Sequence, residues 1–223
     1  MNPALRSSAA HVFVVSLDAP ELQPDDAHHL FRVLRLRDGE TVTASDGAGS
    51  WRLTQVAGQS LVVSGEIVSE PTRRTVTIAS AIPKGDRAEW MVQKLTEIGV
   101  DEIVLLHCDR SVVRWDGDRA TRPLARLQRV AREAAMQSRR VRLPLVTGPQ
   151  TCLSVLARPG VVVAEPGGEP MAALPTSPSV VVIGPEGGFS AAELNTGAPM
   201  IRLGDTVLRV ETAAIVAAVA FLT

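Results

Sequence analysis

The sequence is poor in cysteine, with only two residues of this type, and it has no apolar run long enough to cross a bilayer. Cys108 and Cys152 are too few for a disulfide framework and too isolated for a metal-binding motif. No histidine-rich cluster accompanies them, so we expect no structural zinc and no metal partner. Residues 1–10 lack the basic-then-apolar layout of a signal peptide. We therefore expect a cytoplasmic protein with no membrane partner.

An excess of charge of one sign is also lacking. The chain has 23 Lys and Arg against 24 Asp and Glu, a net charge of −1, so no global basic field indicates a nucleic-acid partner. Locally the balance differs, because ten arginines and only three acids lie between Arg110 and Arg142. This stretch is either a solvated helix face with snorkelling arginines or a surface that follows phosphates, and both readings stay open.

The chain has enough apolar residues to form a hydrophobic core. The chain has 223 residues, 45% of them hydrophobic, which allows one large domain or two small ones. The part up to about residue 69 reads as mostly β and predicts a small barrel. We expect a helix over residues 24–34, a turn at Asp46-Gly47, and strands over residues 11–15, 41–45, 51–56 and 61–68.

After a charged segment at residues 70–74, strand and helix patterns alternate, which predicts an α/β domain with a mainly parallel sheet. Strands are expected over residues 75–82, 102–106, 160–164, 179–183 and 200–203. Helices are expected over residues 86–98, 119–138 and 211–222. The last of these has almost no polar face, so it must be buried, either in the core or against another subunit.

A glycine-rich loop follows the apolar strand at residues 179–183. Gly184, Gly187 and Gly188 surround Glu186, and Ser190 with Glu193 forms a capping box that opens a helix. Such a loop holds a ligand beyond the carboxyl end of a sheet, although a plain strand-to-helix turn remains an alternative. The loop lacks the lysine of a phosphate-binding loop and its acid repels phosphate, so the pattern favours a neutral or cationic ligand.

Two further strand ends resemble this one. Residues 164–168 and 203–213 each follow an apolar strand, and each contains glycine. Because the carboxyl ends of parallel strands meet at one edge of a sheet, we expect the three segments to converge.

Residues 183–189, 203–204 and 208–213, together with Asp38-Gly39-Glu40, Asp46-Gly47 and further motifs upstream, resemble the SPOUT methyltransferases, and within them the 16S ribosomal RNA (uracil-N3)-methyltransferases. The further upstream motifs are His28-His29-Leu30-Phe31-Arg32-Val33-Leu34-Arg35, Lys84-Gly85-Asp86-Arg87, Gln93-Lys94-Leu95-Thr96-Glu97-Ile98-Gly99-Val100 and Arg110-Ser111-Val112-Val113. The resemblance implies an N-terminal PUA-like β-barrel that binds RNA, residues 1–70. It also implies a SPOUT α/β domain, residues 74–223, with a C-terminal trefoil knot. A homodimer, S-adenosylmethionine as cofactor, and 16S ribosomal RNA in the 30S subunit as substrate are implied as well.

The same resemblance implies site residues. Cofactor binding is expected at Ala164, Glu165, Ile183, Gly184, Pro185, Glu186, Gly187, Gly188, Leu203, Gly204 and Leu208. RNA binding is expected at His28, Arg32, Arg35, Lys84, Arg110 and Arg140. The spacing of the first three also puts them on one helix face, whose alternative reading is a merely solvated face.

Arg209 and Glu211 are the candidate catalytic residues. Uracil N3 carries a proton at neutral pH, so methylation requires a group that accepts the proton or stabilises the uracil anion. Arg209 would neutralise charge on the uracil oxygens, and Glu211 would take the proton or fix Arg209. A purely structural Arg–Glu pair is the alternative.

The chain departs from the family pattern near the end of its long helix. Met136 and Arg139 stand where the family has an acid and a glycine. Two other functions stay open: the same fold acting on a ribose 2′-oxygen or a purine nitrogen, and an RNA-binding module without catalysis.

Overall fold

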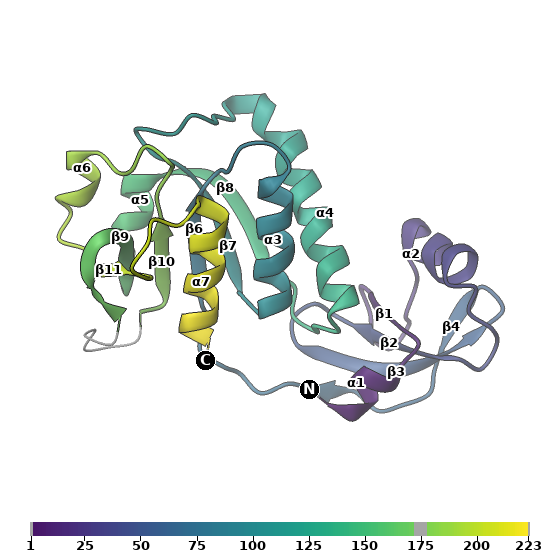
Figure 1. Cartoon of the computed structure of the whole chain (residues 1–223). Coiled ribbons are helices and arrows are strands. Elements are labelled where there is room, and N and C mark those ends of the chain that lie inside the picture. The colour runs from purple at the N-terminus through teal and green to yellow at the C-terminus, as the bar shows by residue number, and fades with distance from the viewer. Residues whose placement is uncertain (1, 172–177, 223) are drawn as a thin grey trace. The chain divides into compact units, whose positions relative to one another are not determined.

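The computed structural model describes residues 2–171 and 178–222, and the chain separates into two compact units (Figure 1). The first unit comprises Met1–Arg73 together with Arg132–Leu143, and the second comprises Arg74–Ala131 together with Pro144–Thr223. Within the described ranges, no helix is both long and apolar enough to cross a membrane.

The first unit is built on a five-stranded sheet. Its strands are β1 (Ala10–Phe13), β2 (Thr41–Ser45), β3 (Ser50–Ala57), β4 (Ser60–Val63) and β5 (Val68–Ser69). The order is β1-β2-β3-β4, with β5 paired to β3, and only the β1–β2 pair is parallel. The single strand expected over residues 61–68 is wrong, because the chain leaves the sheet between β4 and β5.

The helical part of this unit also differs from expectation. After α1 (Pro3–Ser7), the helix expected over residues 24–34 is α2 (Pro24–His28), continued by a π-helical segment (His29–Val33). Leu34 closes this segment, and Arg35 follows with a φ of +57°. Arg35 therefore lies beyond the helix, so the expected common helix face is limited to His28 and Arg32.

An ion pair joins the two pieces of sequence that form the first unit. Arg132 donates through Nη1 and Nη2 to the two carboxylate oxygens of Asp26, at 2.8 and 2.6 Å. Asp26 is only 3% exposed. A bidentate guanidinium satisfies this buried carboxylate in the geometry that arginine favours. Residues 132–143 are thus held to the sheet domain by a specific polar contact.

Arg139 has a backbone that explains the family pattern at its position. Its φ is +60°, in the left-handed region where glycine has no steric penalty. In this chain the arginine side chain compensates, since its guanidinium donates to the carbonyls of Ser8 and Ala9 at 2.9 and 3.2 Å. Arginine at this position is therefore less favourable than glycine for the backbone, but its side chain adds hydrogen bonds to the segment that precedes β1.

The second unit contains a six-stranded sheet in which every neighbouring pair is parallel, as predicted. Its strands are β6 (Thr77–Ala81), β7 (Glu102–His107), β8 (Leu145–Thr151), β9 (Val161–Pro170), β10 (Val180–Ile183) and β11 (Met200–Arg202). The sequence did not predict β8. That strand contains Gly148 and Pro149, which weaken a strand pattern and are tolerated here because β8 lies at the sheet edge.

The helices of this unit are α3 (Arg87–Ile98), the start of α4 (Thr121–Gln137), α5 (Cys152–Leu156), α6 (Ala191–Leu194) and α7 (Val210–Leu222), with a short 3-10 turn (Gly117–Ala120). Gly99 ends α3 with a φ of +114°, as its position after the apolar stripe predicts. Helices α3 and α7 pack side by side, and α7 contacts β6 and β10 (Figure 1). In α7, Ala214, Ala217 and Ala218 are fully buried.

The strand order, β11-β9-β10-β6-β7-β8, sets the position of a ligand site. From β6 the chain adds β7 and β8 on one side, and then β9, β10 and β11 on the other. A reversal of this kind leaves a crevice outside the carboxyl ends of the strands, where open parallel sheets bind ligands.

His11 in β1 gives the first unit a defined response to acid. Its pKa is lowered to about 4, chiefly by burial and next by the positive charge of the nearby Arg139. Since an unfolded histidine titrates near 6.5, the unfolded chain binds more protons between these values, and stability falls as the pH falls from about 6.5 to about 4. The loss attributable to His11 is about 3 kcal/mol. Urea titrations at pH 7 and pH 4 should show this loss in the wild type.

The matched variant is His11→Gln, whose side chain does not titrate. The pH-dependent loss in this variant should be smaller than in the wild type by about 3 kcal/mol. Equal losses in the two proteins would contradict the assignment to His11.

Candidate functional site

A pocket of about 320 Å³ lies beside the middle of β9, at Ala164–Pro166, and at the carboxyl ends of β10 and β11. All the residues that the sequence assigns to cofactor binding line it, namely Ala164, Glu165, Ile183, Gly184, Pro185, Glu186, Gly187, Gly188, Leu203, Gly204 and Leu208. The structure adds Pro166, Phe189, Thr206, Val207, Val210 and Ala213. The three segments therefore converge as predicted.

The glycine loop has its shape for two separate reasons. Gly188 has a φ of +70°, which side-chain-bearing residues rarely adopt. At Gly184 a Cβ atom would lie 2.8 Å from the Phe189 ring, so the ring packs directly on the backbone. The capping box that follows is confirmed: the Ser190 side chain accepts the Glu193 N–H, and Glu193 accepts the Ser190 N–H.

The chemistry of the lining is apolar and acidic. Glu165 and Glu186 are its charged residues, and no arginine, lysine or histidine is among the described residues that form the wall. A phosphate would find no cation to neutralise it here. The pocket therefore suits a neutral or cationic ligand, as the loop sequence indicates.

Glu211, a candidate catalytic residue, is paired differently from the sequence expectation. Arg87 at the start of α3 donates through Nη1 to Glu211 Oε1 at 3.3 Å. Arg87 also lies 4.0 Å from Glu186 of the glycine loop. Sequence reasoning included Arg87 in the Lys84–Arg87 motif but gave it no role. The structural partner of Glu211 is therefore Arg87, and the guanidinium lies between a loop acid and a helix acid.

Arg209 and Glu211 have contrasting environments. The Glu211 side chain is 7% exposed, and its Oε2 has no hydrogen-bond partner in the described part of the chain. Arg209 is exposed, and its carbonyl accepts the Ala213 N–H at the start of α7. Its neighbours Leu208 and Val210 line the pocket. The beginning of α7 thus has an exposed guanidinium, that of Arg209, and a buried carboxylate oxygen without a hydrogen-bond partner among the described residues, Oε2 of Glu211.

The candidate RNA-binding residues fall in both units. His28, Arg32 and Arg35 are exposed in the first unit, where Arg140 is half-buried. In the second unit Lys84 is exposed after β6. Arg110 donates to the carbonyl of Gly187 at 3.2 Å, which ties it to the pocket loop.

Comparison with known proteins defines the class of this chain. Residues 70–222 match the RNA methyltransferase domain model, and residues 22–61 match the RNA methyltransferase PUA domain model. The α/β unit with its pocket and the preceding sheet unit are thus both accounted for. The chain belongs to the RNA methyltransferase family.

Within that family, its relatives carry one name. Ribosomal RNA small subunit methyltransferase E of Mycobacterium bovis is 36% identical, over 86% of this chain and 82% of its own length. A structure of the enzyme of that name from Neisseria gonorrhoeae, bound to S-adenosyl methionine, has a TM-score of 0.77 at 26% identity and covers 95% of each chain. A structure described as a methyltransferase of Legionella pneumophila, with bound SAM, has a TM-score of 0.83 at 26% identity, covering 95% of this chain and 96% of that one.

The Arg87–Glu211 pair predicts a stability effect. Replacing Arg87 with Met leaves the buried Glu211 carboxylate without its cation. Breaking a fully buried pair costs about 3–5 kcal/mol, and solvent screening of the part-exposed Arg87 reduces the expected loss to about 2 kcal/mol. Chemical denaturation of Arg87→Met should show this loss.

The control is Arg126→Met, because Arg126 pairs with Glu89 at 2.9 Å on the exposed surface of the same unit. Its loss should stay within about 0.5 kcal/mol. The double variant Arg87→Met/Glu211→Gln should recover part of the stability lost in Arg87→Met, since no buried charge remains. Equal stability losses in Arg87→Met and Arg126→Met would contradict the inference that the Arg87–Glu211 pair stabilises the fold more than a surface pair does.

Proposed function

We propose that this chain methylates N3 of a specific uridine in 16S ribosomal RNA of the small subunit, with S-adenosylmethionine as the methyl donor. The observation that supports this most directly is the acidic, glycine-lined pocket beside the middle of β9 and at the carboxyl ends of β10 and β11. Family membership and the names of the relatives support the reaction class and the ribosomal substrate.

The pocket residues fit the donor. S-adenosylmethionine supplies a methyl group on a cationic sulfur, together with an uncharged adenosine. Glu165 and Glu186 are the charged residues of the lining and provide negative charge for a sulfonium, with Arg87 lying outside the lining at 4.0 Å from Glu186. At Gly188 and Gly204 no atom lies within 4 Å of where a Cβ would stand, so these positions leave room for a ligand. The size is within the usual range for small-molecule sites, roughly 300–1,000 Å³.

The acceptor atom requires two further functions from the protein. Uracil N3 lies on the Watson–Crick edge, so the base must be unpaired or flipped out before it reaches the pocket. The transfer also exchanges the N3 proton for a methyl group and releases that proton. Glu211 would accept this proton, because its Oε2 has no hydrogen-bond partner among the described residues. Arg209 is the exposed cation that would neutralise charge on the uracil oxygens.

The proposal includes the finer architecture that the resemblance implies. Residues 1–70 would form a PUA-like barrel that binds RNA, and residues 74–223 a SPOUT domain with a C-terminal trefoil knot. We propose a cytoplasmic homodimer, in which α7 supplies part of the interface. The almost wholly apolar sequence of α7 supports a second subunit as a partner for this helix.

Methyl transfer to 30S subunits that lack the modification tests the reaction. The wild type should transfer label from S-adenosylmethionine, and nucleoside mass spectrometry should recover it as 3-methyluridine. Arg209→Ala should lower the single-turnover rate by about 10²–10³-fold, as expected for loss of an anion-stabilising group. Arg202→Ala, an exposed arginine on β11, is the matched control and should retain the rate.

Other outcomes of the methyl-transfer experiment would each contradict one part of the proposal. Label on another nucleoside or on a ribose would overturn the N3 assignment and favour the same fold acting on a different atom. Failure to bind the donor would favour a non-catalytic RNA-binding module. Donor binding without transfer to 30S subunits would contradict the assignment of 16S ribosomal RNA as the substrate. Full activity of Arg209→Ala would show that Arg209 has no part in the mechanism.

RNA binding by the first unit predicts a salt effect. Each phosphate contact contributes about 0.7–0.9 to the slope of log affinity against log salt. Arg32→Glu with Arg35→Glu should raise the RNA dissociation constant and flatten this slope by about 1.4–1.8. Arg6→Glu, an exposed arginine of α1 in the same unit, should leave the slope almost unchanged. A slope unaffected by the double reversal would leave these arginines as a solvated face.

A further inference from the structure

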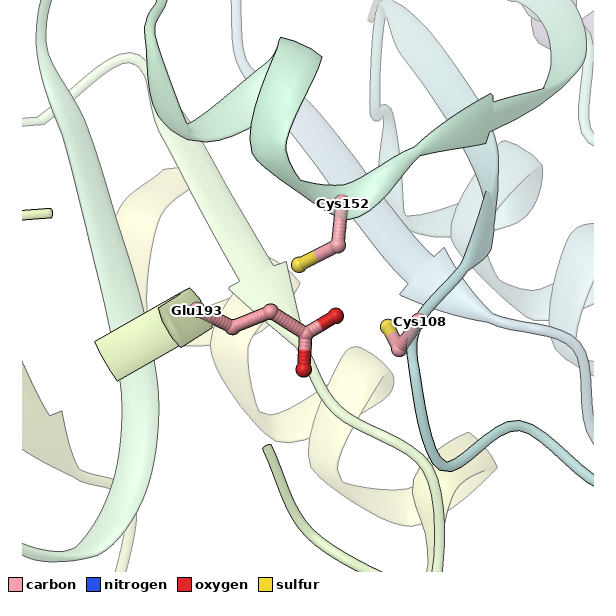
Figure 2. Close-up of side chains that lie close together, drawn as sticks. All are labelled: Cys108, Cys152 and Glu193. Carbon is pink, nitrogen blue, oxygen red and sulfur yellow. The ribbon is translucent and has the colours of Figure 1, made fainter. Parts of the chain in front are cut away.

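Two buried thiols and a buried carboxylate meet in the second unit, outside the lining of the pocket (Figure 2). Cys108 follows β7, Cys152 opens α5 and Glu193 belongs to α6. One donor atom from each residue lies within 4.8 Å of the other two. The three residues are exposed by only 2%, 1% and 1% respectively. In Figure 2 the three side chains point toward a common centre from three different segments.

The parallel sheet explains how two cysteines far apart in sequence come together. His107 and Thr151 are register partners on the neighbouring strands β7 and β8. Cys108 and Cys152 are the next residues after this pair, so both leave the sheet at the same edge and side by side. Their separation in the sequence, which spoke against a metal motif, is removed by strand pairing.

Glu193 is a buried acid whose charge is only partly compensated. Its two carboxylate oxygens accept the backbone N–H groups of Asp109 and Ser190, at 2.9 and 2.8 Å. Among the described residues no Lys, Arg or His forms a salt bridge with it. The thiol of Cys152 has a raised pKa, first because of its hydrogen bond with Cys108, then because of burial, and also because of the Glu193 charge. A buried acid without a cationic side-chain partner among the described residues therefore lies beside two buried cysteines.

We propose that Cys108, Cys152 and Glu193 bind one zinc ion. Two sulfur donors and one carboxylate oxygen are ligands that Zn²⁺ accepts, and a water completes a tetrahedral set. Binding displaces one proton from each thiol, so one Zn²⁺ enters as two protons leave. The cluster has a net charge of −1 with two thiols and a carboxylate, and the same charge with zinc and two thiolates. The buried site therefore takes up a divalent cation without any change in its net charge.

The site lies outside the pocket, because none of its three residues lines it. Its connections nevertheless reach the glycine loop. Glu193 caps the helix that begins at Ser190, and the Ser190 hydroxyl donates to Asp109 Oδ2 at 2.5 Å. An ion here would join the end of β7, the start of α5 and α6, and would hold the outer side of the pocket wall in place.

A disulfide between the two cysteines is the competing outcome, and the surroundings disfavour it. Thiolate is the reactive form in oxidation, and the pKa of the Cys152 thiol is raised by its hydrogen bond with Cys108, by burial and by the charge of Glu193. A bound metal ion displaces the protons itself, so the same surroundings are compatible with metal binding.

Metal titration of the reduced, tag-free full chain tests the site. After chelation, Co²⁺ should bind with one equivalent per chain and produce thiolate-to-cobalt charge-transfer absorption, and Zn²⁺ should abolish that absorption by competition. In weakly buffered solution the wild type should release two protons per Zn²⁺ bound. This readout requires no variant, so it stays informative if a substitution prevents folding.

Variants assign the ligands. Cys108→Ser and Cys152→Ser should each lose the charge-transfer band that the wild type shows. Glu193→Gln should weaken zinc binding while keeping a capping-box residue at this position. His29→Ala removes an exposed histidine of the first unit and should leave the band unchanged. Far-ultraviolet circular dichroism and cooperative unfolding check that each variant is folded.

Three results would overturn the proposal. The first is absence of stoichiometric Co²⁺ or Zn²⁺ binding to the reduced wild type. The second is a band that persists in the double variant Cys108→Ser/Cys152→Ser. The third is release of fewer than two protons per zinc, which would mean that at least one thiol is not a ligand. Recovery of the chain as a Cys108–Cys152 disulfide that binds no metal after reduction would assign the pair to redox chemistry instead.

Discussion

Parallel pairing of all six strands in the second unit is the constraint on which its functional features depend. Parallel strands must be joined by crossovers, so each strand runs in the same direction and every carboxyl end lies at one edge. The pocket is lined by the middle of β9 and by the segments that follow β10 and β11. Cys108 and Cys152 follow β7 and β8 at that same edge. A single topological choice therefore gathers groups from distant parts of the sequence.

The features that sequence could predict are local. The glycine loop, the capping box of Ser190 and Glu193, and the left-handed Gly99 after α3 each depend on residues within a few positions of one another. Short apolar runs in the sequence also predicted five of the six parallel strands, because strands buried on both faces consist almost entirely of apolar residues. Recognition of the strand ends as one site then required only that the strands run parallel.

The features that sequence could not predict depend on the choice of a distant partner. Arg87 and Glu211 are 124 positions apart, so Arg209 was the nearer candidate for Glu211 by sequence alone. Strand β8 has a weak local pattern at Gly148-Pro149, and its place in the sheet comes from pairing with β7. The π-helical form of residues 29–33 likewise gives no local signal in the sequence. Tertiary context decides in each case.

The ion pair between Asp26 and Arg132 makes the first unit discontinuous along the chain. The sheet strands end by Ser69, whereas the guanidinium that neutralises Asp26 is supplied by a helix that begins at Thr121. During synthesis from the N-terminus, the sheet segment emerges from the ribosome well before this counter-charge is available. A nascent chain must therefore carry an unpaired Asp26 while the next 106 residues, up to Arg132, are added, and final consolidation of the N-terminal unit awaits translation of the long helix.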